Sequence, residues 1–323
     1  MGSEQANEHK NNQLLGSNMR YSTLGSSGLE VSRVCLGSMT WGLQNNQQEA
    51  DEQIDYALSQ GINFIDTAEM YPVPPNQKTQ GDTERIIGDW IHRHPQKRQD
   101  FVLASKITGP GISYMREGGI IDGPSVLKAV DRSLQRLQTD YIDLYQLHWP
   151  ERGVNCFGVR DYPYQYSAKD AENHLEILET LNEFVKAGKI RQVGLSNETP
   201  WGTMQYLQKA KDHNLPRMVS IQNSYSLIHR AYEYGMSEVS MREDIGLLAY
   251  SPLAFGVLSG KYIGGKKPAD ARVTLFPNYN RYSTPESEKA VIAYQKLAQK
   301  HGMSLAELSL AFVNQLPFVT SNI

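Results

Sequence analysis

The sequence contains little cysteine. Only two cysteines, Cys35 and Cys156, occur among its 323 residues, and neither stands in a C-x-x-C pair or at the Cys/His spacing of a zinc site. We therefore expect neither a disulfide framework nor a metal site. Because free thiols are typical of reducing compartments, the sequence favours a cytoplasmic protein.

Long apolar runs and a strong net charge are also missing. No stretch is long and apolar enough to predict a helix that crosses a bilayer. Residues 1–19 are polar and rich in Asn, Gln and Gly, without the apolar core of a signal peptide, and we expect them to form a disordered tail. The formal net charge of −3 gives no electrostatic reason to expect a nucleic-acid or membrane partner.

Short β-branched runs alternate with helix-length amphipathic segments along the chain. The strand-like runs are residues 33–39, 62–68, 101–107, 142–149, 190–197, 218–225, 245–253 and 318–323. Their continuous apolar character is typical of parallel strands covered by helices. Eight such units without a break in composition predict an α/β fold, a (β/α)8 TIM barrel rather than a doubly wound sheet. Before them, "YSTLGSSGLEV" at residues 21–31 predicts an N-terminal β-hairpin.

Polar side chains close three of these apolar runs. Asp66 is near the end of the second run, Lys106 of the third and His148 of the fourth. Tyr71 stands just beyond Asp66. A lone buried polar residue is usually a satisfied core group, but the strand ends of a barrel lie side by side at the face where active sites form. We therefore expect these four side chains to converge.

The chemistry of the four groups indicates a general acid. The ordinary pKa of a tyrosine is about 10, which is high for proton exchange at neutral pH. An ammonium at Lys106 should lower the pKa of Tyr71, and Asp66 can hold that ammonium in place. His148 can hydrogen-bond a substrate carbonyl oxygen. Together they could protonate an oxygen that gains charge when hydride reaches a carbonyl carbon.

Such a site has no hydride of its own, so a cofactor is implied. The G-x-G-x-x-G signal is absent, and residues 255–262 do not form a P-loop because Phe255 and Tyr262 stand where Gly and Ser or Thr are required. A nicotinamide would then be held by strand ends. Candidates for its carboxamide are Ser196, Asn197 and Gln222. Tyr250, which is followed by Ser251, could stack on the ring.

Two connections that follow strands are long, from about residue 71 to 82 and from about residue 151 to 170. In a barrel both would border the active-site face. Their proline and aromatic content suggests ordered pocket walls, although spacers without fixed structure are the alternative. The aromatic residues favour a pocket for apolar or planar carbonyl substrates; they are Trp149, Phe157, Tyr162, Tyr164 and Tyr166.

The ordered set of motifs resembles the aldo-keto reductase family, and especially its Tas-like branch. The motifs are "LGSMTWG", "GINFIDTAEMY", "VLASKI", "LYQLHWP", "VGLSN", "IQNSYSL" and "AYSPLAFGVLSGKY". The likeness covers essentially residues 20–323. It implies an (α/β)8 barrel that reduces small aldehydes or ketones with NADPH, with Asp66, Tyr71, Lys106 and His148 at the four catalytic positions.

The resemblance also implies a set of cofactor-binding residues. Gly37, Ser38, Met39 and Thr40 would border the nicotinamide, next to the carboxamide and stacking residues given above. Ser251, Pro252, Leu253 and Phe255 would line the pyrophosphate. Lys261 and Arg272 would lie near phosphate groups. NADPH is expected on this analogy, and NADH is not excluded.

The chain departs from the family pattern at its end. Members continue beyond "FVTSNI" with a Gly-containing turn, a helix that grips the adenosine 2′-phosphate, and further helices. We therefore expect residues 20–323 to form a barrel that is truncated at about the eighth strand and lacks the usual C-terminal helices. Two alternatives stay open: a cofactor-binding regulatory protein similar to channel β subunits, and a catalytically impaired truncated isoform. The oligomeric state is left open.

Overall fold

The computed structural model describes residues 19–159, 161–164, 167 and 170–323. Residues 1–18 of the expected tail lie outside the described residues, as does Tyr166. The division into a tail and a truncated barrel, and the expected lack of further helices, stay predictions. In the described part of the chain no helix combines the length and the apolar character needed to cross a membrane.

The expected N-terminal hairpin is present. Strands β1 (Tyr21–Thr23) and β2 (Glu30–Ser32) pair antiparallel around a 3-10 turn, η1 (Gly25–Ser27). Leu24 and Val31 of this hairpin are buried with residues of the barrel interior. Gly25 has a φ of 49°, and a Cβ there would clash with the carbonyl oxygen of Val219, so glycine lets the hairpin approach the barrel backbone closely.

Eight parallel strands form one sheet in the order in which they occur along the chain. They are β3 (Leu36–Gly37), β4 (Phe64–Asp66), β5 (Val102–Ile107), β6 (Ile142–Leu147), β7 (Ile190–Ser196), β8 (Met218–Ser224), β9 (Gly246–Tyr250) and β10 (Val319–Asn322). Each matches one of the eight apolar runs. This sheet, with its surrounding helices, fits the predicted (β/α)8 fold.

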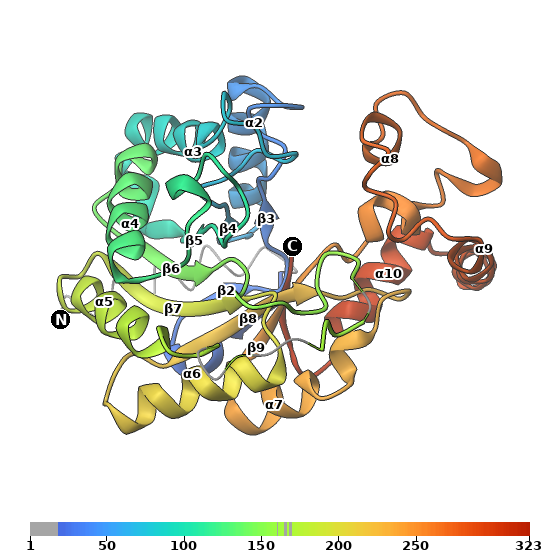
Figure 1. Cartoon of the computed structure of the whole chain (residues 1–323). Helices are drawn as coiled ribbons and strands as arrows, with labels where there is room; N and C mark the ends of the chain where they lie inside the picture. The colour runs from blue at the N-terminus through green and yellow to red at the C-terminus, as the bar shows by residue number, and fades with distance from the viewer. Residues whose placement is uncertain (1–18, 160, 165–166, 168–169) are drawn as a thin grey trace, which may run out of the picture.

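The first and last strands of the sheet meet at a seam. Val34 and Asn322 form a parallel bridge, in which Cys35 N donates to Asn322 O at 2.7 Å and Asn322 N donates to Arg33 O at 3.1 Å. In addition, Ser321 Oγ donates to Ser32 O at 2.8 Å. Figure 1 shows the C-terminus beside β3.

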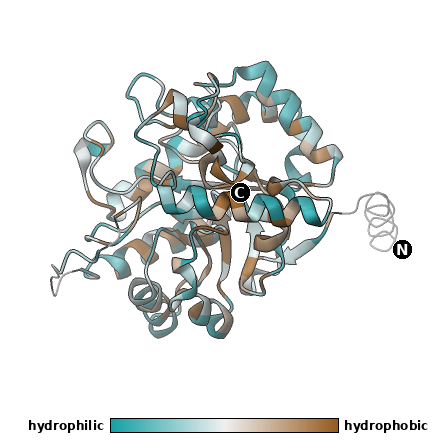
Figure 2. Ribbon diagram, turned by 90° about the vertical axis from the view of Figure 1, so that its right-hand side faces the viewer, coloured by the Kyte–Doolittle hydropathy of each residue, from teal (hydrophilic) through white to brown (hydrophobic). Residues whose placement is uncertain are grey.

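Helices cover the outside of the sheet (Figure 1). They are α2 (Gln47–Ser59), α3 (Asp82–Arg93), α4 (Gly123–Leu137), α5 (His174–Lys186), α6 (Pro200–Asp212), α7 (Met236–Glu243) and α10 (Leu305–Asn314), whereas α9 (Pro285–Lys300) and the short α8 (Arg272–Leu275) lie away from the strands. Their starts are well signalled: Asn46 and Glu49 form a capping box on α2, and Ser304 and Glu307 form one on α10. Apolar residues gather inside the molecule and polar residues on the outer helical faces (Figure 2).

Besides the two long connections expected from the sequence, the structure contains a third that was missed. Residues 251–284 leave β9 and pass through η5 (Ala254–Ser259), η6 (Ile263–Gly265) and α8 before α9 begins. Figure 1 shows α8 and α9 set apart from the other helices. Leu258 and Tyr282 of this excursion share an apolar cluster with Leu227, with Val291 of α9 and with Leu305 of α10.

Candidate active site

The four polar residues singled out in the sequence come from three adjacent strands. Asp66 is the last residue of β4, Lys106 is the penultimate residue of β5, and His148 directly follows β6. Tyr71 follows a turn after β4, and its amide donates to Ala68 O at 3.1 Å. All four side chains are buried. Because neighbouring parallel strands end at the same edge, the fold brings these side chains together.

Lys106 is the centre of this group. Its Nζ donates to Asp66 Oδ2 at 2.6 Å and to the backbone oxygen of Thr67 at 2.8 Å. The hydroxyl of Tyr71 lies 3.5 Å from the same nitrogen. The rings of Tyr71 and His148 meet edge to face, with centroids 5.8 Å apart. The convergence predicted from the sequence is therefore present.

Two glutamines complete the environment of Asp66. Gln222 Nε2 donates to Asp66 Oδ1 at 2.8 Å, and Gln146 Nε2 donates to the same oxygen at 3.2 Å. Gln222, expected to bind a carboxamide, is thus bonded to the carboxylate of the site in this structure. Gln146 was missed by the sequence analysis, although a polar residue in the apolar run "IDLYQL" was a signal that could have found it.

Glu69 and Arg116 fix the turn that carries Tyr71. Glu69 Oε1 accepts from the backbone N of Thr108 and from Arg116, each at 2.6 Å. Arg116 also donates to Thr108 O at 2.6 Å. Both side chains of this ion pair are buried. The pair ties the turn after β4 to the chain that follows β5. Neither residue was predicted from the sequence to belong to the site.

Burial dominates the titration of the phenol. It raises the pKa of Tyr71 above the ordinary value of 10.0, while the charge and hydrogen bond of Lys106 lower the pKa, Asp66 raises it, and Arg272 lowers it slightly. Lys106 therefore acts in the direction expected from the sequence. The expected net lowering is nevertheless wrong, because removing the phenol from water disfavours the phenolate more than the ammonium favours it.

Lys106 is charged, whereas His148 is neutral. Burial alone would lower the pKa of Lys106, but Asp66 and Tyr71 raise it, with a raised pKa as the result. Burial and the charge of Lys106 hold the pKa of His148 well below 6.5. The site thus holds an ammonium next to a neutral imidazole, and a neutral imidazole can donate one hydrogen bond and accept another.

Asn197 and Tyr250 form a second polar group next to the first. Asn197 Nδ2 donates to His148 O at 2.9 Å and to Ser196 Oγ at 3.1 Å. The hydroxyl of Tyr250 donates to Asn197 Oδ1 at 2.7 Å. A carbonyl oxygen accepts two hydrogen bonds, so Asn197 Oδ1 has capacity for one more donor. Ser196 Oγ donates to Gln222 O at 2.8 Å.

The segment after β9 has an unusual backbone. Ser251, Ala254 and Phe255 have φ values of 58°, 48° and 58° without being glycine. Such left-handed residues cost free energy and cluster at ligand-binding sites. Backbone N–H groups in turns of this kind can form a concave anion site. Pro252 is buried, and Leu253 packs in the apolar cluster of the excursion.

The remaining expected cofactor residues lie on both sides of this segment. The guanidinium of Arg272 is 5.6 Å from the centroid of the Phe255 ring. Lys261 is exposed, with its Nζ 5.8 Å from the centroid of the Tyr262 ring. Across the mouth, Gly37 ends β3 and Ser38 Oγ donates to Asp66 O at 2.7 Å. Thr40 Oγ1 donates to Asn45 Oδ1 at 2.7 Å.

Apolar side chains surround Tyr71. Tyr71 is clustered with Ala68 and Met70, and the partly buried residues packed against this cluster are Met39, Val73, Ile112 and Trp149. Trp149 contacts the rings of His148 and Phe157, with centroids 4.9 and 5.6 Å away. Tyr162 and Tyr164 contact each other edge to face and are exposed.

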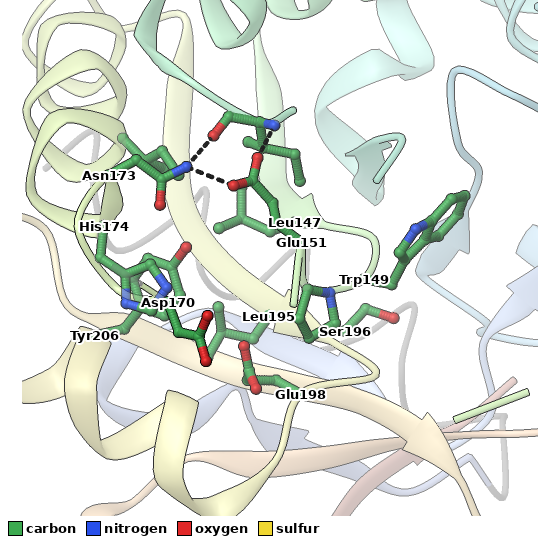
Figure 3. Close-up of a pocket in the computed structure, with 13 residues that line it drawn as sticks. Leu147, Trp149, Glu151, Asp170, Asn173, His174, Leu195, Ser196, Glu198 and Tyr206 are labelled. Atoms are coloured by element: carbon green, nitrogen blue, oxygen red, sulfur yellow. Dashed lines mark hydrogen bonds between the residues drawn. The ribbon is translucent and has the colours of Figure 1, made fainter. Parts of the chain in front are cut away.

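Outside the ends of β6 and β7 lies a small cavity, shown in Figure 3. Its volume of about 20 Å³ has room for roughly one water molecule, so it is too small for a carbonyl substrate. Glu151, His174 and Glu198 are among the residues that line it. In the described part of the chain, no group of three or more His, Cys, Asp or Glu side chains could hold a metal ion.

The fold and the site together define an α/β barrel with a buried Tyr–Lys–Asp–His group at the ends of its strands. Residues 33–323 match the model of the aldo/keto reductase family. The chain belongs to the aldo/keto reductase family, and it is an oxidoreductase.

Three relatives illustrate the likeness. The chain is 49% identical to Protein tas of Escherichia coli K12, with 94% of this chain and 88% of that protein covered. It is 33% identical to the uncharacterized oxidoreductase YrpG of Bacillus subtilis over 94% of this chain and 86% of that protein. It is 29% identical to versiconal hemiacetal acetate reductase of Aspergillus parasiticus over 91% of this chain and 85% of that protein.

Proposed function

We propose that this protein reduces aldehydes and ketones to alcohols with NADPH, and that Tyr71 is the general acid. The observation that carries the proposal is the placement of one phenol beside both a cation and a neutral imidazole. The Tyr71 hydroxyl lies 3.5 Å from Lys106 Nζ, and its ring meets His148 edge to face. A raised pKa keeps the phenol protonated at neutral pH, as a proton donor requires.

A reduced nicotinamide, when bound, supplies the hydride that adds to the carbonyl carbon. The carbonyl oxygen then carries negative charge, and the proton of Tyr71 moves to it. The ammonium of Lys106 stabilises the phenolate that remains, while Asp66 holds the ammonium in place at 2.6 Å. His148, neutral because its pKa is low, donates a hydrogen bond to the same carbonyl oxygen and orients it.

The residues near this acid fit a nicotinamide cofactor. Asn197 Oδ1 accepts one hydrogen bond from Tyr250, so its second acceptor position is suited to a carboxamide N–H. The left-handed backbone at Ser251 and Phe255 fits the approach of a pyrophosphate. The positive charge of Arg272 lowers the pKa of Tyr71, so Arg272 lies close enough to the site to attract the phosphate groups of a cofactor. We also propose that the protein binds NADPH more tightly than NADH.

The substrate class that we propose is an apolar or planar carbonyl compound. The cluster that contains Tyr71 is flanked by partly buried apolar residues, which offer apolar surface near the acid; they are Met39, Val73, Ile112 and Trp149. A planar ring placed against Trp149 would gain stacking contact in addition to burial.

Turnover and binding assays test this function together. Purified protein should oxidise NADPH only when an aromatic aldehyde is added, and NADPH should quench the protein fluorescence to saturation. NADH should bind more weakly, and Arg272→Leu should weaken the binding of NADPH. Saturable NADPH binding without aldehyde-dependent oxidation would favour a cofactor-binding regulatory protein over an enzyme. No saturable binding would reject the proposal.

A further inference from the structure

We propose that Glu198 is a positioning residue for Asn197 and that Arg152 clamps Glu198, so that this ion pair sets the contact of Asn197 with the nicotinamide carboxamide. The inference rests on the proposed function, because it assigns Asn197 to the carboxamide. Neither Arg152 nor Glu198 touches the reacting atoms. Both act through Asn197.

Arg152 and Glu198 form a buried, two-pronged ion pair. One guanidinium nitrogen of Arg152 donates to Glu198 Oε2 at 3.1 Å, and the other donates to Glu198 Oε1. The second nitrogen also donates to Thr199 Oγ1 at 2.8 Å. The side chains are only 9% and 4% exposed. A paired geometry of this kind fixes both orientation and distance.

The chain around Glu198 is held from several directions. Asn197 N donates to Gln222 O at 3.0 Å, and Asn223 Nδ2 donates to Glu198 O at 3.0 Å. These two bonds hold the backbone against β8. The carboxylate of Glu198 accepts from Thr199 N at 2.7 Å. Arg152 is the only charged group that pairs with this carboxylate among the described residues.

This arrangement matters because Asn197 has a left-handed backbone, with φ of 52°. A non-glycine residue keeps such a conformation only where its surroundings enforce it. If the clamp on Glu198 were removed, the turn could relax, and the side chain of Asn197 would leave the position set by His148 O and Tyr250. Its free acceptor position would then no longer face the carboxamide.

The residue before Arg152 connects the same loop to the start of α5. The neighbouring residue Glu151 accepts from Ile121 N and from Asn173 Nδ2, the latter at 2.8 Å. Figure 3 shows Glu151 and Glu198 on either side of the small cavity. Residues 151 and 152 therefore tie the loop that follows Trp149 to the start of α5 on one side and to the turn before α6 on the other.

A glycine leaves the space that the ion pair of Arg152 and Glu198 occupies. Gly202 lies in the first turn of α6, and a Cβ there would clash with the Glu198 carboxylate and with the Arg152 guanidinium. Its φ is not in the left-handed region, so the requirement for glycine here is one of space. The position was not marked by any motif used in the sequence analysis.

The test compares two cofactors in Arg152→Met and Glu198→Gln. The probes are NADPH and its acetylpyridine analogue, in which a methyl group replaces the carboxamide NH2, so the analogue cannot donate to Asn197. We expect each variant to weaken NADPH binding by about 5- to 10-fold, the worth of about one hydrogen bond. Binding of the analogue should change by less than about twofold. Arg242→Met, which removes an exposed pair with Glu238, should change neither.

Each result has a definite meaning. Equal weakening of both cofactors, or no weakening of either, overturns the inference, because a merely structural or absent role would give that result. If a single variant fails to fold, Arg152→Met/Glu198→Met leaves no unpaired buried charge and should show the same selective loss. A wild-type protein that does not bind NADPH rejects the proposed function. Wild-type binding without the selective loss rejects only the clamp.

Discussion

Tyr71→Phe should remove most of the turnover and leave the fold intact. The phenol has one hydrogen bond to another described side chain, a long one of 3.5 Å to Lys106. Lys106 keeps its bonds to Asp66 and Thr67 at 2.6 and 2.8 Å after the change. The free energy of unfolding should therefore fall by no more than about 1 kcal/mol.

The expected loss of catalysis is much larger. A positioned general acid contributes roughly 10²- to 10⁴-fold in rate, or about 3–5 kcal/mol of transition-state stabilisation. The assay follows aldehyde-dependent oxidation of NADPH at saturating cofactor, with the Kd for NADPH measured separately by fluorescence. Tyr56→Phe is the matched control, because Tyr56 is 68% exposed on α2.

The pH profile gives a second measurement on the same residue. The acid must be protonated to act, and burial holds its pKa above 10.0. Reduction by the wild-type protein should therefore be constant through neutral pH and fall only at alkaline pH. Turnover of Tyr71→Phe within about fivefold of wild type, a loss far short of that estimated for the acid, would refute the assignment of Tyr71.

Three further changes test the surroundings of the site. Lys106→Met should cost about 3–5 kcal/mol in urea unfolding, because Asp66 is left buried without a cation; Asp66→Asn/Lys106→Met should regain stability but not activity. The pKa of His174 is lowered from 6.5 to about 3, mainly by burial. As the pH falls below 6.5, His174 therefore takes up a proton in the unfolded chain but not in the folded protein, and the folded protein loses stability. His174→Phe should therefore lose about 2 kcal/mol less stability than wild type between neutral pH and about pH 5; equal losses would contradict this. Gly202→Ala should destabilise the protein by about 1–3 kcal/mol, because the added Cβ would clash with the carboxylate of Glu198. This loss should exceed the gain from the better helix propensity of alanine. A variant that is more stable than wild type in thermal melting would show that Glu198 and Arg152 can move aside.

The sequence was sufficient for the order of the elements. Continuous apolar runs located all eight strands. Between residues 231 and 243 the chain forms two separate elements, η4 (Ala231–Glu233) and α7, because Gly235 between them has a φ of 105°. Without a structure, nothing distinguished this glycine from one that a helix tolerates.

The four polar residues at strand ends could also be predicted, because parallel strands place their ends together. The sign of the pKa shift of Tyr71 could not, since it depends on how completely the phenol is buried. Arg272 lowers the pKa of Tyr71 although the two residues are 201 positions apart in the chain (272 − 71). Glu69 and Arg116 likewise pair across a distance in sequence that local patterns do not report. These contacts depend on how the loops fold over the barrel.

The seam between β3 and β10 has a consequence for how the molecule opens. Its backbone contact is a single bridge, Val34 to Asn322, whereas β5 and β6 share four register pairs. Local opening follows the places with the fewest cooperative bonds. Amide deuterium uptake should therefore begin at residues 33–37 and 319–322, before the strands that carry Lys106 and Gln146 exchange. The strands that carry Lys106 and Gln146 would then belong to the slowly exchanging part of the barrel, and the two strands that close the barrel would open first.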